Sequence, residues 1–438
     1  MNQLIIVPMS IEDLIPSPNN ARTHSNRQLK QLESSIKAFG NNTPIIIDEN
    51  RTILCGHARY EVLKRLGYTA VPTIGIEHLT KAQKRAFMIA DNKIAENAAW
   101  DIDLLTIELN YLLQVDIDVD VDLTGFSMGE IDVLLGAAGH PAVEDAPPPP
   151  PDPANTVTQL GDTWQLGSHR IVCGDCRSTD VMDALMECDR AQMVITDPPY
   201  NVPIHGHVSG LGRTQHDEFA MASGEMTFDE FIEFLSDALG QMARISVDGS
   251  LHYVFMDWRH QFELLIAGQQ LQNPLVNLCV WVKTNGGMGS LYRSQHELIY
   301  IFKKGASPHI NNVELGRHGR YRTNVWTYPG VNAFGAGRDE ALAAHPTVKP
   351  VAMIADAILD VTHRGDIVLD GFLGSGTTLL AAEQTGRVCY GVEIDPGYVD
   401  VALHRWMEAT GEQAVHVPSG HSFDELAERR AELEWCEV

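Results

Sequence analysis

Short apolar runs, each followed by a polar or glycine-rich stretch, recur through the second half of the chain. They occupy residues 193–196, 366–370 and 388–392, and the stretch at 379–383 between the last two has the composition of a helix. Short apolar runs bounded by turn signals are typical of strands buried in a parallel sheet, and strands alternating with helices are typical of a doubly wound α/β fold. The pattern therefore predicts a mostly parallel sheet with helices on its faces and ligand-binding loops at the carboxyl ends of its strands.

The first hundred residues follow a different pattern. Apolar residues recur at helical spacing between positions 29 and 39, another helix is expected after Gly56, a short strand is predicted at 71–74, and a further helix at 81–97. This arrangement predicts a smaller α+β domain ahead of the α/β domain.

A proline-rich stretch separates the two parts. Six prolines between positions 144 and 153 favour a stiff, extended spacer that joins neither helix nor sheet. The predicted parts are a small domain at 1–100, an acidic helical extension at 101–140, a linker at 141–156, the α/β domain at 157–412 and a charged tail at 413–438. The tail is expected to form a solvent-exposed helix from Asp424 onward.

The composition is typical of a cytoplasmic enzyme. The chain has 438 residues, 44% of them hydrophobic, which is enough for two or more cored domains. It begins without a basic leader, and no stretch is apolar enough to suggest a membrane span, so no membrane partner is expected. Seven cysteines, an odd number spread along the chain, favour reduced thiols.

Two stretches resemble metal sites, but neither is complete. Cys173 and Cys176 form a C-x-x-C pair, but no second pair or histidine cluster accompanies them, and structural zinc needs four ligands. The acidic run at 116–122 resembles the start of a calcium loop, but Val121 and Ser127 stand where that loop needs glycine and glutamate. No metal is expected, and the run is interpreted as an acidic solvated face or strand.

The charge is unevenly distributed. The net charge is −26, yet residues 280–350 hold nine Lys and Arg against four Asp and Glu. Basic residues interleaved with aromatic residues, glycine and asparagine suit contact with nucleic-acid phosphates and base edges. A solvated loop is the alternative interpretation of this stretch.

A glycine loop follows the apolar run that ends at Asp370. Residues 371–378 read Gly-Phe-Leu-Gly-Ser-Gly-Thr-Thr, and a helix is expected directly after them. Glycines allow a ligand to approach backbone N–H groups at a helix N-terminus, and Glu393, at the end of the next strand, is placed to accept two ribose hydroxyls. The loop has neither the P-loop pattern nor the Gly-x-Gly-x-x-Gly spacing, so phosphate-rich ligands are disfavoured, with dinucleotide binding left as an alternative.

A second loop begins directly after the run at 193–196 and reads Asp197, Pro198, Pro199 and Tyr200. The Asp197 carboxylate and the Pro198 carbonyl can both accept hydrogen bonds from an exocyclic amine, while Tyr200 offers a flat face on which a base can stack. The alternative interpretation is an ordinary Pro-Pro turn closed by an aromatic residue.

With both loops in this order, residues from about 157 to 410 resemble the beta class of amino DNA methyltransferases, which use S-adenosyl-L-methionine. The resemblance implies a Rossmann-like doubly wound methyltransferase domain in which Asp197, Pro198, Pro199 and Tyr200 are catalytic, and a target recognition region at about 305–344. The residues that it implies for cofactor binding are Asp175, Cys176, His345, Thr347, Lys349, Pro350, Asp370, Phe372, Gly374, Ser375, Gly376, Thr377, Thr378 and Glu393. Those that it implies for DNA contact are Lys283, Arg293, Ser294, His296, Arg317, Arg320 and Arg322.

The expected reaction is site-specific transfer of a methyl group to the exocyclic N6 amine of an adenine flipped out of double-stranded DNA. Two alternatives stay open. One is transfer to the N4 amine of cytosine, which Asp197 disfavours because serine is the usual first residue of that variant. The other is a nucleotide-binding or DNA-segregation protein whose methylase half is vestigial.

The first hundred residues resemble the ParB N-terminal domain. Leu14-Ile15-Pro16, Asn19 to Arg22 and Gly56 to Tyr60 carry this resemblance, which implies nucleotide binding, of CTP or ATP, at Gly56, His57 and Arg59. His57 replaces the family's usual acidic residue. The partners expected for the whole chain are double-stranded DNA, a nucleotide at this domain and a second copy of the chain in a homodimer.

Overall fold

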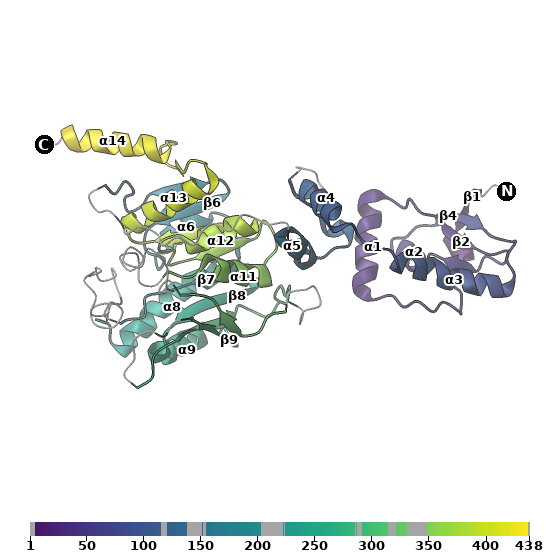
Figure 1. Ribbon diagram of the computed structural model, residues 1–438, viewed down its shortest axis with the longest axis horizontal. Helices are drawn as coiled ribbons and strands as arrows, with labels where there is room; N and C mark the ends of the chain where they lie inside the picture. Colours follow the sequence, from purple (N-terminus) through teal and green to yellow (C-terminus); the bar gives the residue numbers. More distant parts are fainter. Residues whose placement is uncertain are drawn as a thin grey trace. The chain divides into compact units, whose positions relative to one another are not determined.

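The chain divides into two compact units, Met1–Ala138 and Gly139–Val438. The computed structural model describes residues 5–114, 121–137, 151, 155–202, 222, 224–284, 286, 291–313, 321–330 and 348–436 (Figure 1). Most of the predicted linker at 141–156 and of the acidic run at 116–122 lies outside these ranges.

The N-terminal unit contains a four-stranded sheet in the order β1-β4-β2-β3. Its strands are β1 (Ile6–Ser10), β2 (Ile45–Ile47), β3 (Ile53–Cys55) and β4 (Ala70–Gly75). Its helices are α1 (Asn26–Phe39), α2 (His57–Arg65), α3 (Lys81–Glu96), α4 (Ile102–Gln114) and α5 (Met128–Ala137). The predicted α+β class is confirmed for this unit.

Local sequence signals set the ends of these helices. Ser25 caps α1 by accepting a hydrogen bond from the Gln28 backbone N–H, and Thr80 and Gln83 form a reciprocal capping box at the start of α3. The apolar spacing between positions 29 and 39 buries Leu29 and Ile36 against the sheet. These helices therefore form where the sequence predicts them.

The C-terminal unit is built on a ten-stranded sheet in the order β11-β9-β10-β8-β7-β12-β13-β6-β5-β14. The central strands are all parallel: β8 (Ser246–Met256), β7 (Ala191–Thr196), β12 (Ile367–Asp370), β13 (Val388–Glu393) and β6 (His169–Cys173). The predicted parallel, doubly wound class is confirmed for this centre.

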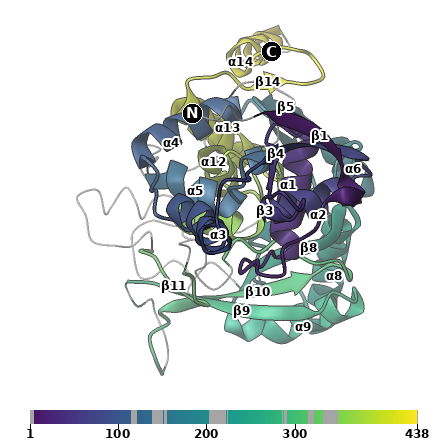
Figure 2. The ribbon, with the colours of Figure 1, turned by 90° about the vertical axis from the view of Figure 1, so that its right-hand side faces the viewer.

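Antiparallel pairs extend the sheet at both sides. On one side, β10 (His296–Lys303) runs antiparallel to β8 and to β9 (Leu275–Val282), and the short β11 (Val325–Thr327) follows, parallel to β9. Figure 2 shows β8, β9 and β10 with α9 (Gln261–Gln270) beside them. On the other side, β5 (Thr163–Leu166) and β14 (Val415–His416) are antiparallel additions.

Helices cover both faces of this sheet because side chains alternate along its strands. In β7, Val194 packs with α6 (Thr179–Met186), α8 (Phe228–Arg244) and α9, whereas Met193 and Ile195 pack with α11 (Val351–Val361) and α12 (Thr377–Thr385). A third cluster joins α12 and α13 (Pro396–Thr410) to β5 and β6. The loops that follow the parallel strands begin at the carboxyl ends of these strands.

The C-terminal tail differs from its prediction. A helix does form there, α14 (Phe423–Cys436), but Phe423 and Leu426 are buried against Trp164 rather than exposed. Arg430 also pairs with Asp162 at 2.7 Å. The α/β unit therefore continues past the predicted limit at 412, because β14 and α14 close one edge of its core.

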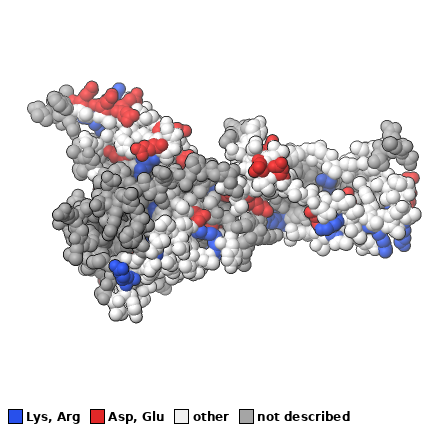
Figure 3. All heavy atoms as spheres, viewed as in Figure 1, with Lys and Arg blue, Asp and Glu red and all other residues white. Residues whose placement is uncertain are grey.

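The outer side of α14 is nevertheless strongly acidic. Figure 3 shows acidic groups gathered over this helix, where Asp424, Glu425, Glu428 and Glu432 are all exposed. Among the described residues, no helix is long and apolar enough to cross a membrane.

Candidate active site

Three neighbouring parallel strands bring the two predicted loops to one edge of the sheet. Strand β12 lies between β7 and β13, with Leu369 opposite Val194 and Asp370 opposite Gly391. Asp197 follows the end of β7, the glycine loop follows β12, and Glu393 ends β13. The carboxyl edge of a doubly wound sheet is where such folds bind ligands.

Thr196 and Asp370 connect the two loops directly. The Thr196 hydroxyl donates to Asp370 Oδ1 at 2.8 Å. Thr196 directly precedes Asp197, and Asp370 directly precedes the glycine loop. Asp370 also accepts the Thr378 hydroxyl at 2.6 Å and the Phe372 N–H at 3.1 Å. Burial raises the pKa of Asp370 to about 6 despite these three donors. The Asp370 side chain, which the sequence suggested for cofactor binding, is therefore occupied in bracing the loops from beneath.

The glycine loop has one open and one crowded glycine. Gly374 has φ of +54°, and a Cβ built on it would meet no atom within 4 Å. Gly376, with φ of +84°, begins α12 and would place its Cβ 2.8 Å from that of Ala402. Gly374 thus leaves room above the loop for a ligand, and Gly376 lets α12 pack closely on α13.

Glu393 holds the glycine loop from the neighbouring strand. Its two carboxylate oxygens accept the Gly374 N–H at 2.8 Å and the Asp395 N–H at 2.9 Å. Burial raises the pKa of Glu393 to about 7, although the side chain keeps some exposure. An ionised carboxylate has about four acceptor positions, so Glu393 can still accept hydroxyl groups of a ligand.

The remaining predicted cofactor residues around this loop are mostly buried. Phe372 packs against Phe234, with ring centroids 5.9 Å apart, while Ser375, Thr377 and Thr378 are buried around the first turn of α12. The Ser375 carbonyl accepts a hydrogen bond from Arg405 at 2.7 Å. These side chains shape the loop and leave its backbone to face a ligand.

The segment after β6 lies beside Glu393. The Gly174 N–H donates to the Glu393 carbonyl at 2.9 Å, and the Asp175 carboxylate pairs with Arg177 at 2.7 Å. Cys176 is only 3% exposed, and burial raises the pKa of its thiol. Its side chain therefore belongs to the core beneath the loop. In the part of the chain that the structure describes, no group of three or more His, Cys, Asp or Glu could hold a metal ion.

Asp197 is the centre of a charged cluster. Its Oδ1 accepts the Tyr200 hydroxyl at 2.6 Å, and its Oδ2 is bonded to the Lys349 ammonium. The same ammonium lies 3.3 Å from Glu297 Oε2, and Lys283 pairs with Glu297 Oε1 at 2.5 Å. Sequence reasoning assigned Lys349 to the cofactor, but the structure gives its charge to Asp197 and Glu297.

The pKa values of the two carboxylates in the cluster shift in opposite directions. Burial raises the pKa of Asp197, and the attraction of Lys349 only partly offsets this effect. Burial acts in the same direction on Glu297, but Lys349 and Lys283 together hold its pKa below the usual range. Burial also raises the pKa of Tyr200, so its hydroxyl stays protonated and serves as a donor to Asp197.

Two residues of this site were missed by sequence reasoning. Glu297 was not among the predicted site residues, although a charged residue in the apolar strand β10 is a signal that could have marked it. Asn201, which has φ of +52°, anchors the end of the loop that begins at Asp197. Its side chain accepts the Gly224 and Met226 N–H groups and donates to the Met226 carbonyl at 2.8 Å.

The predicted DNA contacts fall into three groups. Arg293, Ser294 and His296 are exposed, as phosphate contacts must be, whereas Lys283 is paired with Glu297. Arg317 and Arg320 lie outside the described residues, as do His345 and Thr347 of the predicted cofactor set. Pro350 is described and caps the start of α11.

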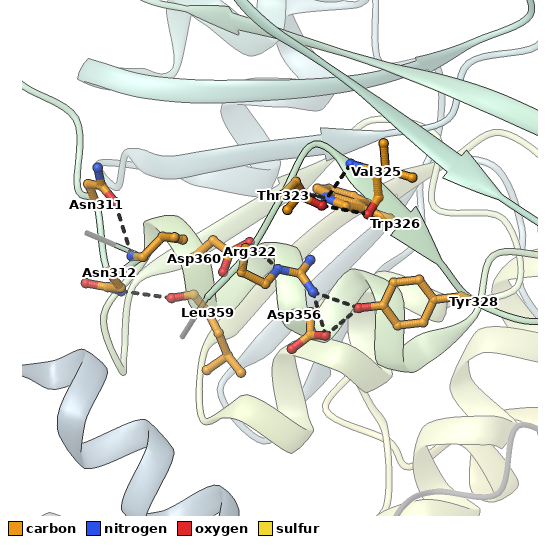
Figure 4. Close-up of polar contacts among 11 residues, drawn as sticks. Asn311, Asn312, Arg322, Thr323, Val325, Trp326, Tyr328, Asp356, Leu359 and Asp360 are labelled. Atoms are coloured by element: carbon orange, nitrogen blue, oxygen red, sulfur yellow. Dashed lines mark hydrogen bonds and ion pairs between the residues drawn. The ribbon is translucent and has the colours of Figure 1, made fainter. Parts of the chain in front are cut away.

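Arg322, which was predicted to contact DNA, is paired within the protein. Its guanidinium pairs with Asp356 at 2.9 Å and with Asp360 at 3.1 Å, and it donates to the Tyr328 hydroxyl at 2.8 Å (Figure 4). It also lies over the Trp326 ring, 5.2 Å from the centroid. Both carboxylates belong to α11, so Arg322 ties the segment before β11 to this helix.

The predicted nucleotide loop of the N-terminal unit begins α2. Gly56 has φ of +101°, and no side chain caps the helix there. The His57 ring accepts the Ser17 N–H at 3.2 Å, and burial lowers the pKa of His57. Arg59 is half-buried, and within the described ranges it has no ion-pair partner.

Comparison with protein families finds three matches. Residues 191–404 match the DNA methylase family, residues 2–93 match the ParB N-terminal domain, and residues 103–160 match the ParB-methyltransferase HTH domain. The last match covers α4 and α5, which sequence reasoning described only as an acidic helical extension.

Individual proteins match the α/β unit. Type II methyltransferase M.HpaI of Haemophilus parainfluenzae is 27% identical over 234 residues, which are 50% of this chain and 69% of that protein. Type II methyltransferase M.HinfI of Haemophilus influenzae is 28% identical over 234 residues, 49% of this chain and 63% of that protein. Among solved structures, PvuII DNA methyltransferase (cytosine-N4-specific) is 16% identical with a TM-score of 0.44, over 62% of this chain and 94% of that one.

Proposed function

Because residues 191–404 belong to the DNA methylase family, we propose that the protein transfers a methyl group from S-adenosylmethionine to the N6 amine of adenine in double-stranded DNA. The observation that carries this proposal is the hydrogen bond between Thr196 and Asp370. It fixes Asp197, the amine acceptor, beside the open glycine loop that would receive the methyl donor.

The residues around that loop suit the donor. Gly374 leaves open space for close approach, Glu393 can accept ribose hydroxyls, and the segment from Gly174 to Cys176 borders the same edge. When bound, S-adenosylmethionine supplies an electrophilic methyl group on a sulfonium sulfur.

Asp197 and Pro198 act on the amine. The lone pair of an exocyclic amine is delocalised into the base, so its nitrogen is a weak nucleophile. The Asp197 carboxylate and the Pro198 carbonyl accept its two N–H groups, which raises electron density on nitrogen and aims its lone pair. Transfer would form an N–C bond as the S–C bond of the donor breaks with its electron pair left on sulfur, and the Asp197 carboxylate, which already accepts an N–H, would take the proton that the nitrogen loses.

The base must leave the duplex to reach Asp197. Tyr200, fixed through its hydroxyl, presents a ring on which a flipped base can stack. Exposed Arg293, Ser294 and His296 lie in the same chain segment as Glu297 and can contact the DNA backbone.

The test is transfer of labelled methyl groups to duplex DNA by the full-length protein, followed by nucleoside analysis of the product. We expect N6-methyladenine, and we expect Asp197→Ala to lower the rate about 10²-fold or more while binding of the methyl donor is kept. Asp183→Ala is the matched control, since its carboxylate pairs with Arg244 on an exposed surface of α6.

Each unexpected product has a distinct meaning. N4-methylcytosine would replace the adenine assignment with the cytosine alternative, which Asp197 at the first position of the motif disfavours. Unmodified DNA with every duplex, or an unchanged rate in Asp197→Ala, would end the proposal.

A second proposal concerns the N-terminal unit, where the uncapped start of α2 and the half-buried Arg59 suit an anion. We infer that a nucleotide triphosphate, CTP or ATP, binds at Gly56, His57 and Arg59. Equilibrium binding of both nucleotides to residues 1–136 tests this inference, with Arg59→Met as the variant expected to lose binding. Failure of both nucleotides to bind would end the idea.

A further inference from the structure

The Lys349 ammonium takes one acceptor position on the carboxylate that the proposed reaction needs. It is bonded to Asp197 Oδ2, while Tyr200 takes Asp197 Oδ1 at 2.6 Å. An ammonium and an amine are both N–H donors and seek the same lone pairs of a carboxylate. An amine approaching Oδ2 therefore competes with Lys349 for the same oxygen.

Lys349 has a second acceptor close by. Its side chain is 6% exposed and lies beside the rings of Phe255 and Tyr200, 5.1 and 5.9 Å from their centroids. These contacts disfavour a move into solvent. Glu297 Oε2, however, is only 3.3 Å from the ammonium and can receive it after a small displacement.

Glu297 is itself fixed in place. Lys283 holds its other oxygen at 2.5 Å, and Lys283 also lies over the Trp281 ring, 4.7 Å from the centroid. Lys283 and Lys349 thus face Asp197 and Glu297. The charges of these four described residues balance whichever of the two carboxylates Lys349 contacts. A buried charge keeps its ionised form only when it is paired, which makes such a balanced cluster necessary here.

We propose that Lys349 is a movable counterion of Asp197, and that Glu297 is the positioning residue that receives its ammonium when the target amine enters. This inference rests on the proposed methyl transfer. In the free protein the Lys349 ammonium favours the ionised form of Asp197, and in the complex the amine takes the acceptor position that the ammonium leaves.

The other charged and titratable groups around Asp197 constrain the test. Tyr200 donates from the same loop, Lys283 and Glu297 face the cluster from β9 and β10, and Asp257 and Asp370 add negative potential from the ends of β8 and β12. Among the described residues, Lys349 is the cation bonded to Asp197 and Glu297 is the carboxylate that shares it, so these two are the informative variants.

The two variants should move the pKa of Asp197 in opposite directions. Lys349→Met removes the cation, so Asp197 should titrate about 1 to 3 units higher, and the acidic limb of kcat should move to higher pH. Glu297→Gln removes the competing anion, so Lys349 pairs more tightly with Asp197. The limb should then move to lower pH, and kcat/KM for DNA should fall about tenfold because the ammonium yields less readily.

The measurement is an NMR titration of aspartate carboxyl carbons in the full-length protein without ligands, with Asp197→Asn to assign the signal, joined to pH profiles of methyl transfer. Glu297→Gln keeps the shape of the side chain and so guards against a folding defect. Glu297→Asp should restore part of the rate, and Lys283→Met, which leaves Lys349 in place, should have the smaller effect on Asp197.

Each outcome decides the matter. Shifts of the Asp197 pKa in opposite directions in Lys349→Met and Glu297→Gln support the role of Lys349 as its counterion. The proposal would be overturned if the pKa of Asp197 shifted in the same direction in both variants or did not shift at all. It would also be overturned if Lys349→Met weakened the affinity for the methyl donor without any shift of that pKa. Because the titration needs no turnover, opposite shifts in a protein that methylates no DNA would reject the proposed function and the entry of the amine, and would leave only the pairing of Lys349 with Asp197 in place.

Discussion

Gly374 and Gly376 lie two residues apart in the loop after β12, yet their surroundings differ. Both have positive φ, a conformation that costs a non-glycine residue about 1 to 2 kcal/mol. A methyl group on Gly374 would point into open space, whereas one on Gly376 would lie 2.8 Å from the Ala402 side chain and 3.1 Å from its Cα. Gly374 thus has open space in front of it, whereas Gly376 is needed for the packing of α12.

These different surroundings predict that Gly374→Ala and Gly376→Ala have different effects on stability and on binding of the methyl donor. Gly376→Ala should destabilise the α/β unit by about 2 to 4 kcal/mol, the sum of backbone strain and overpacking. Gly374→Ala should cost only about 1 to 2 kcal/mol but should weaken binding of the methyl donor strongly. Thermal unfolding and calorimetric titration with S-adenosylmethionine measure the two effects, and equal losses of stability with unchanged donor binding would contradict this account.

At the scale of elements, β11 and α11 are joined by Arg322 (Figure 4). The strand lies at the edge of the sheet beside β9, and α11 begins directly after Lys349 and Pro350. Arg322 bonds Asp356 and Asp360 of this helix, so the segment before β11 is fixed to the helix that follows Lys349.

Arg322→Met should therefore act on stability rather than on DNA charge. We expect a loss of about 1 to 3 kcal/mol, between the values for exposed and buried ion pairs, because the arginine is 18% exposed. The salt dependence of DNA binding should not change, whereas loss of a true phosphate contact lowers its slope by about one. Arg293→Met, at an exposed position, is the control expected to show the reverse.

At the scale of the whole molecule, the two units have separate hydrophobic cores. The N-terminal unit is built around Ile45, Val62 and Leu63, with a smaller cluster between α4 and α5, while three other clusters belong to the ten-stranded sheet. The helices α4 and α5 match an HTH model but carry no Lys or Arg, so phosphate contact must come from elsewhere in the protein.

Separate cores predict separate folding. Residues 1–138 and 139–438 should each unfold cooperatively when produced alone, and the second fragment should retain methyl transfer. Residues 139–412 are the control, because loss of α14 removes buried Phe423 and Leu426, worth about 1.5 to 3 kcal/mol each, and the Asp162–Arg430 pair. Calorimetry of the three fragments measures this, and a single shared transition in the full chain would contradict it.

The sequence by itself determined the strand-loop-helix units and the order of the two site loops. The run at 193–196 and the glycines at 374 and 376 are local signals, since a strand, a tight turn and a helix start each depend on neighbouring residues. The carboxyl edge of a parallel sheet then brings Asp197, the glycine loop and Glu393 together without further information.

Only the tertiary structure decided which charged groups meet. Lys349 lies 152 positions from Asp197, and Arg430 lies 268 positions from Asp162, so no periodicity or spacing connects them. From the sequence alone, a charged side chain such as lysine, arginine or glutamate can be assigned to a ligand, to DNA or to an oppositely charged residue. The packing of α11, β10 and α14 settles the choice, because a buried charge lies where an opposite charge is within reach.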